Sequence, residues 1–214
     1  QLEDVQYFED ELHAAVMAAE DAGTYVMVHV YVPEAIRRAI RAGVKSIEHG
    51  QLIDEPTMKL IAEKGVWLSM QPFIGEGNNH YTNPVQQAKH ELVVQGTDRA
   101  YQLAKKYGVK LAWGTDLLFS PANARNQNLN IEKMTRWFSN FEILKMITHD
   151  NAELLALSGR RNPYPGKLGV IEEGALADLI VVDGNALEDI KVLTDPGKNM
   201  LLIMKDGKIY KNDL

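Results

Sequence analysis

Short apolar runs alternate along the chain with longer segments in which hydrophobic residues recur every three or four positions. The longer segments have the period of amphipathic helices, and residues 33–43 show it best, with Pro33 as a helix start and Gly43 as a stop. The apolar runs predict strands at residues 24–30, 44–49, 66–73 and 109–116. Apolar strands that alternate with helices are typical of a parallel sheet covered by helices.

The pattern changes near Gly166. Residues 166–184 and 199–212 are β-branched runs broken by glycine, and Asp206-Gly207 lies between apolar runs, which is a strong hairpin signal. This part predicts a small β module. Residues 128–158 before it have a helical pattern, with core candidates at Phe141, Leu144, Ile147, Leu154 and Leu157.

Composition narrows the function classes. A chain of 214 residues with 45% hydrophobic content can bury a core, and a net charge of -6 with mixed signs gives no basic stripe for nucleic acid. The absence of cysteine excludes disulfides and thiolate metal sites. Neither an apolar run long enough for a membrane span nor a signal-peptide pattern is present, and the location in the cell stays open.

Three polar side chains follow predicted strands. His29 and His49 end two successive strands, and Asp116 ends the fourth in the stretch WGTD. One histidine at a strand end is more often structural than a ligand, and an aspartate after Gly-Thr is often a turn or helix-cap residue. Carboxyl ends of parallel strands share one edge, however, and two imidazoles with a carboxylate suit zinc or a similar divalent ion.

At these residues the chain resembles the metal-dependent amidohydrolase superfamily, in particular its imidazolonepropionase-like and prolidase-like members. The matching stretches are VMVHVYVPEAIRRAIRAGVKSIEHG, LAWGTD and GKLGVIEEGALADLIVVDGNALEDI. The resemblance implies an α/β fold: the C-terminal half of a TIM-like (β/α)8 barrel (strands five to eight) in residues 1–160, and part of a small β-sandwich domain in residues 161–214.

The resemblance also implies roles. His29 and His49 would be metal ligands, and Asp116 would be both a metal contact and the catalytic base. The cofactor would be Zn2+, as one or two divalent ions. The activity would be hydrolysis of C–N bonds in an amide or dipeptide, prolidase- or carboxypeptidase-like, with a deaminase, a cyclic-amide hydrolase or an inactive scaffold as alternatives.

Two family features have no counterpart here. The H-x-H pair of the first barrel strand and a bridging carboxylated lysine cannot be placed, because the one histidine before His29 is His13, on a predicted helix. We therefore expect a fragment that alone binds metal weakly and hydrolyses nothing. We also expect it to self-associate or to pair with the missing N-terminal half.

Weaker candidates surround the predicted edge. Tyr31 and Arg125 could contact a substrate carboxylate or carbonyl, although a packing tyrosine and a surface arginine are ordinary alternatives. His80 and His90 flank the loop and helix after the third strand, where solvated surface is the simpler interpretation.

Overall fold

The computed structural model describes residues 2–75, 81–117 and 124–214. Its contacts divide the chain into two compact units. Unit 1 holds residues 1–114 and 156–161, and unit 2 holds residues 115–155 and 162–214. The predicted boundary between residues 160 and 161 stays a prediction. Within the described part of the chain, no helix is both long and apolar enough to cross a membrane.

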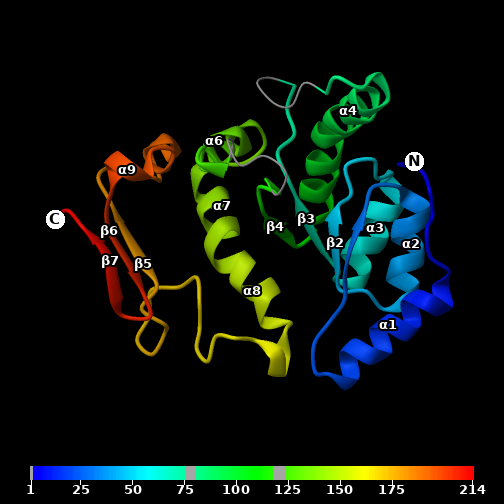
Figure 1. The fold of residues 1–214 in the computed structure, drawn as a ribbon, viewed down its shortest axis with the longest axis horizontal. Coiled ribbons are helices and arrows are strands. Elements are labelled where there is room, and N and C mark those ends of the chain that lie inside the picture. Colours follow the sequence, from blue (N-terminus) through cyan, green and yellow to red (C-terminus); the bar gives the residue numbers. More distant parts are fainter. Residues whose placement is uncertain (1, 76–80, 118–123) are drawn as a thin grey trace. The chain divides into compact units, whose positions relative to one another are not determined.

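Unit 1 is built on a parallel sheet with the strand order β1-β2-β3-β4 (Figure 1). The strands are β1 (Met27–Val30), β2 (Ser46–His49), β3 (Trp67–Met70) and β4 (Leu111–Trp113). The helices are α1 (Glu9–Asp21), α2 (Pro33–Ala42), α3 (Glu55–Lys64) and α4 (Pro84–Tyr107), and each packs on the next. A strand order that never reverses is compatible with right-handed crossovers that leave the helices on one face.

The sequence pattern located these elements well. Asp54 caps α3 through a hydrogen bond from the Thr57 backbone N–H, and Gly43 and Gly65 end α2 and α3 in the left-handed conformation. The strands are shorter than the apolar runs, so that β4 stops at Trp113 and not at residue 116. The mixed α/β class is confirmed.

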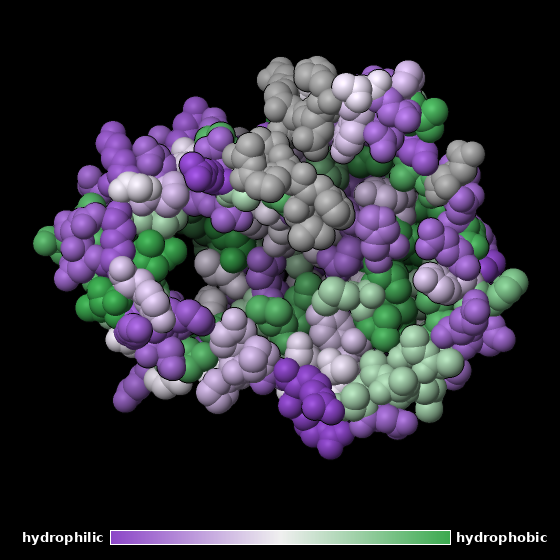
Figure 2. All heavy atoms as spheres, in the orientation of Figure 1, coloured by the Kyte–Doolittle hydropathy of each residue, from purple (hydrophilic) through white to green (hydrophobic). Residues whose placement is uncertain are grey.

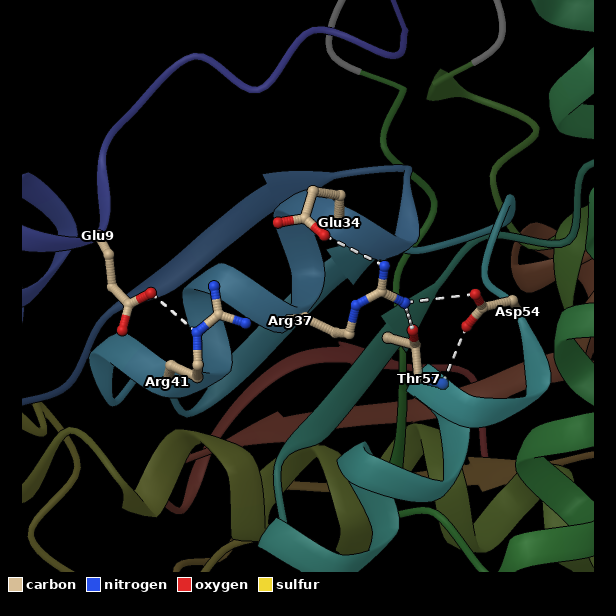
Figure 3. Close-up of polar contacts among 6 residues, drawn as sticks. All are labelled: Glu9, Glu34, Arg37, Arg41, Asp54 and Thr57. Carbon is tan, nitrogen blue, oxygen red and sulfur yellow. Dashed lines mark hydrogen bonds and ion pairs between the residues drawn. The ribbon is translucent and has the colours of Figure 1, made fainter.

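A polar network ties the starts of α2 and α3 together (Figure 3). The Arg37 guanidinium donates to the Thr57 hydroxyl at 2.7 Å and to the Asp54 carboxylate at 3.3 Å. Partial burial raises the pKa of Asp54, but hydrogen bonds from Thr57 and the charge of Arg37 outweigh it and hold the pKa below its ordinary value. A second pair, Arg41 with Glu9, links α2 to α1. The network fixes the chain that leads out of β2.

Helix α4 approaches that same chain at a glycine. A Cβ atom on Gly96 would lie 2.2 Å from the backbone oxygen of Gln51, which is closer than real atoms come. The helix can therefore reach the loop after β2 only because position 96 has no side chain.

Unit 2 contains a helical segment and a small antiparallel sheet. Its helices include α6 (Leu129–Lys133), α7 (Asn140–Lys145) and α9 (Pro196–Asn199). A 3-10 turn η1 (Met134–Arg136) follows α6, and a π-helical turn η2 (Met146–Asp150) leads from α7 into α8 (Asn151–Ala156). Two further 3-10 turns are η3 (Gly159–Arg161), which belongs to unit 1, and η4 (Ile190–Leu193).

The small sheet has the order β5-β6-β7, with β5 (Leu179–Val182), β6 (Met200–Lys205) and β7 (Lys208–Asn212). The predicted hairpin is present, because Asp206 and Gly207 both have positive φ, as a two-residue type I′ turn requires. Hydrophobic side chains reach the surface of this sheet (Figure 2), among them Ile180 and Ile209.

One group of core assignments was wrong in part. Leu154 is buried, but Phe141 is 64% exposed and Leu157 is exposed too. Leu144 and Ile147 are half-buried. Phe141 lies in the first turn of α7, before the π-helical turn, and the buried face of this helix begins two residues later at Ile143. The other buried hydrophobic positions of this segment are Ile131, Met134, Phe138, Ile143 and Met146.

We expect Gly96→Ala to destabilise the protein by about 1–3 kcal/mol, the usual cost of overpacking. The sign of the change in the free energy of unfolding is informative, because alanine inside a helix normally stabilises a protein by ~1 kcal/mol relative to glycine. Urea unfolding measures the change. Gln95→Ala, at an exposed neighbouring position, is the control and should leave the free energy of unfolding nearly unchanged. A more stable Gly96→Ala variant would contradict the close approach.

Candidate functional site

The carboxyl ends of β1 and β2 bring three aromatic rings together. Their parallel register pairs His29 with Glu48 and Val30 with His49, so both histidines lie at the same edge of the sheet. The ring centroids of His29 and His49 are 4.3 Å apart. Tyr31, just beyond β1, stacks on His49 at 4.9 Å and meets His29 edge-on at 5.2 Å. The structure thus brings these two side chains together, and their role as metal ligands stays a prediction.

The backbone at His49 is what turns its ring toward His29. Side chains alternate along a strand, so His49 would share the face of Ile47, which is fully buried, whereas His29 shares the face of Glu48. His49 has a φ of 79°, in the left-handed region, and Gly50 follows at 72°. This costs a non-glycine residue roughly 1–2 kcal/mol. Such strain is characteristic of functional positions.

Two glutamines orient the His49 ring, one directly and one through the other. The Nδ1 atom of His49 lies 2.7 Å from Oε1 of Gln71, and the Gln51 amide nitrogen donates to the same oxygen at 3.3 Å. All three side chains are buried, with 4%, 5% and 1% of their surfaces exposed for His49, Gln71 and Gln51. The contact gives the imidazole a fixed orientation.

One atom in this cluster has no partner. Within the described residues, the buried Oε1 of Gln51 accepts no hydrogen bond. A buried acceptor without a hydrogen bond destabilises a protein, so such atoms are rare in native cores. They are more common next to binding sites. Neither glutamine was predicted from the sequence. The available signal was a glutamine just after an apolar strand: Gln71 follows β3 directly, and Gln51 follows β2 by two residues.

Asp116 lies three residues beyond the end of β4. Its side chain is exposed and its φ is 49°, a second left-handed residue among the predicted ligands. It belongs to unit 2, whereas His29 and His49 belong to unit 1. The convergence of the three side chains therefore stays a prediction.

The weaker candidates have varied surroundings. Arg125 is exposed on the chain before α6. His90, on α4, lies near the rings of Phe73 and Tyr81, and burial lowers its pKa below the ordinary value. His80 lies outside the described residues.

The pair of imidazoles fits part of a divalent-metal site. Nitrogen donors suit zinc, and a histidine whose Nδ1 is hydrogen-bonded can present Nε2 to an ion. Among the described residues there is no group of three histidine, cysteine, aspartate or glutamate side chains that could hold one ion. The structure therefore brings together two of the three predicted ligand side chains.

Comparisons with known proteins agree on one family. The amidohydrolase family matches residues 2–210. Ochratoxinase of Aspergillus niger is 32% identical over 96% of this chain and 42% of its own length. A prolidase crystallised with N-methylphosphonate-L-proline has a TM-score of 0.84 and 36% identity, over 97% of this chain and 50% of its own.

A Xaa-Pro dipeptidase crystallised with methionine in its active site has a TM-score of 0.80 and 32% identity, over 97% of this chain and 50% of its own. The chain thus spans about half the length of these relatives, between 42% and 50%.

The left-handed conformation of His49 can be tested in metal-free protein. We expect His49→Gly to be more stable than His49→Ala by about 1 kcal/mol, because glycine adopts positive φ without steric cost. Chelator-treated samples would be unfolded in urea. At Ser69 in β3, an ordinary strand position, the order should reverse and Ser69→Gly should be the less stable variant. The same order at both positions would argue against the strained backbone.

Proposed function

The chain belongs to the amidohydrolase family, and from that premise we propose that it supplies half of the active site of a metal-dependent hydrolase that cleaves C–N bonds. One observation carries the proposal: the rings of His29 and His49 meet at the carboxyl edge of a parallel sheet, with a centroid distance of 4.3 Å. Active sites of helix-covered parallel sheets form at this edge. A scaffold alone has no need of paired imidazoles there.

The proposed ligands are His29, His49 and Asp116, and the proposed ion is zinc, either single or one of a pair. Bound zinc would polarise the scissile carbonyl and bring the pKa of a water molecule to near 7. His29 and His49 would hold the ion through ring nitrogens. Gln71 and Tyr31 keep the His49 ring in place through a hydrogen bond and a stacked contact.

We assign the proton transfers to Asp116. As a carboxylate it can accept a proton from the attacking water and pass it to the leaving nitrogen, which then departs as an amine. The proposal is supported by its place in the sequence, three residues after Trp113 ends β4, where loop residues of parallel sheets carry catalytic groups.

Tyr31 and Arg125 are proposed to bind substrate. Tyr31 already packs on both imidazoles, so its hydroxyl is carried by a ring that the site holds rigidly. The exposed Arg125 can offer a guanidinium to a substrate carboxylate.

For the substrate class we propose dipeptides with a C-terminal proline or a related amide. The support is similarity to a prolidase and a Xaa-Pro dipeptidase, both above 30% identity. Ochratoxinase is an equally similar relative, so a larger amide is the neighbouring possibility within the same chemistry. Deamination, cyclic-amide hydrolysis and an inactive scaffold remain alternatives that the assay below separates.

We also propose that the sheet of unit 1 corresponds to strands five to eight of a (β/α)8 barrel, and the small sheet to part of a β-sandwich. The strand order without reversal supports this, as do the outer strands β1 and β4, each of which pairs with one neighbour only among the described residues. Met27 on β1 is 51% exposed, and the small sheet also carries exposed hydrophobic side chains. Strands from a longer form of the chain, or from a partner, would cover these surfaces.

The function is tested with a form of the protein that spans the full length of its relatives. We expect zinc-loaded protein to hydrolyse Xaa-Pro dipeptides, chelation to abolish the activity and zinc to restore it. The panel should include other dipeptides, N-acyl amino acids, cyclic amides and deaminase substrates. Ammonia release without amide cleavage would favour the deaminase, and no turnover on any substrate would favour the scaffold.

The 214-residue chain by itself should hydrolyse nothing and should regain activity when it is mixed with the other half. Turnover by this chain as a monomer, with size measured by light scattering, would contradict the proposed division of the barrel.

Replacing the proposed base gives a separate test. Asp116→Asn should lower kcat by roughly 100- to 10,000-fold, because the amide cannot accept the proton, while an oxygen ligand remains. Zinc content measured by atomic absorption should fall only modestly. Asp54→Asn is the control, because Asp54 caps α3 and has no proposed chemical role. Wild-type kcat in Asp116→Asn would rule Asp116 out as the base.

A further inference from the structure

We propose that Gln71 is a positioning residue that fixes the tautomer of His49 and so makes its Nε2 atom the metal-binding atom. The inference rests on the proposed function, which makes His49 a ligand. Beyond the proposed ligand set, it assigns a role to Gln71 and specifies Nε2 as the atom of His49 that faces the metal.

The hydrogen-bond chemistry is directional. Oε1 of a glutamine has no proton to donate, so the Nδ1 atom of His49 that faces it at 2.7 Å must carry the proton. In a neutral imidazole the lone pair then lies on Nε2. Only a nitrogen with a free lone pair can bind a metal ion, so the contact decides which side of the ring is the ligand.

The position of Gln71 is itself well fixed. It follows β3 directly and precedes Pro72, which restricts its backbone to extended conformations. The carbonyl of Gln71 also accepts a hydrogen bond from the backbone N–H of Phe73 at 2.9 Å. A residue held on both sides of its Cα can impose an orientation on the histidine of the neighbouring strand.

The Gln51 amide is oriented to match this arrangement of the Gln71 amide. Its nitrogen donates to the same Oε1 of Gln71 at 3.3 Å, so that one oxygen accepts two hydrogen bonds. The reverse arrangement, with the Gln71 nitrogen toward His49, would place the proton of a neutral ring on Nε2. Both ring nitrogens would then be occupied and His49 could not bind metal. The two arrangements thus predict opposite tautomers.

The experiment uses the full-length protein with 15N-labelled histidine. Long-range proton–nitrogen NMR spectra of the metal-free form identify the protonated ring nitrogen, and the His49 signal is assigned by its loss in His49→Gln. Zinc affinity is measured separately by competition with a chromophoric chelator. The variants are Gln71→Met, which keeps the length of the side chain without an acceptor, and Gln71→Glu, which keeps only acceptors.

We expect the wild type and Gln71→Glu to carry the proton on Nδ1 and to bind zinc with similar affinity. Gln71→Met should lose this preference and bind zinc roughly 10- to 100-fold more weakly, the usual effect of removing such a partner. Thermal unfolding of the metal-free variants shows whether the loss of zinc affinity reflects a general loss of structure. Gln71→Glu should keep the affinity even if both variants unfold at a lower temperature than the wild type.

Two results would overturn the inference: a wild-type His49 protonated on Nε2, or a Gln71→Met variant that binds zinc as tightly as the wild type. Failure of the proposed function looks different. In that case His49→Gln would leave the zinc affinity unchanged, while the tautomer measurement would still decide what Gln71 does.

Discussion

Burial of the helix-facing side of β2 and β3 is the interaction on which the rest of unit 1 depends. Ile47 and Leu68 are fully buried there, as are Ile36 on α2 and Met58 on α3. Burying a side chain of this size contributes about 1.5–3 kcal/mol. Because the strands run parallel, the packing that hides these residues also aligns the carboxyl ends of all four strands, and the paired imidazoles follow from that alignment.

The sequence was sufficient wherever the signal is local. Helix ends at Gly43 and Gly65, the cap at Asp54 and the hairpin at Asp206-Gly207 each depend on a few neighbouring residues, and all are present. That His29 and His49 lie at the same edge of the sheet was also predictable, because the carboxyl ends of adjacent parallel strands are neighbours. The contact between their rings was not, because they are offset by one residue in register and depend on the left-handed backbone at His49.

Features that depend on distant residues were not predictable in this way. The contact of Gln71 with His49 joins residues 22 positions apart, and its existence depends on the register of β2 and β3 and on the turned backbone at His49. Phe141 was misassigned for a similar reason, since which side of the short helix α7 is buried depends on the residues packed against it, and Ile143 takes the core position. The approach of α4 to Gln51 is visible in the sequence only as one glycine inside a helix.

The positive φ of His49 also limits how this position can change over evolutionary time. Apart from glycine, the residues that tolerate the left-handed region best are asparagine and aspartate. Both are one nucleotide away from histidine in the genetic code, and both carry an oxygen donor. The substitutions of His49 that the backbone tolerates therefore introduce oxygen ligands, which favour harder ions such as Mg2+ or Mn2+ more than imidazole does. In such a lineage the metal preference could change while the backbone stays as it is.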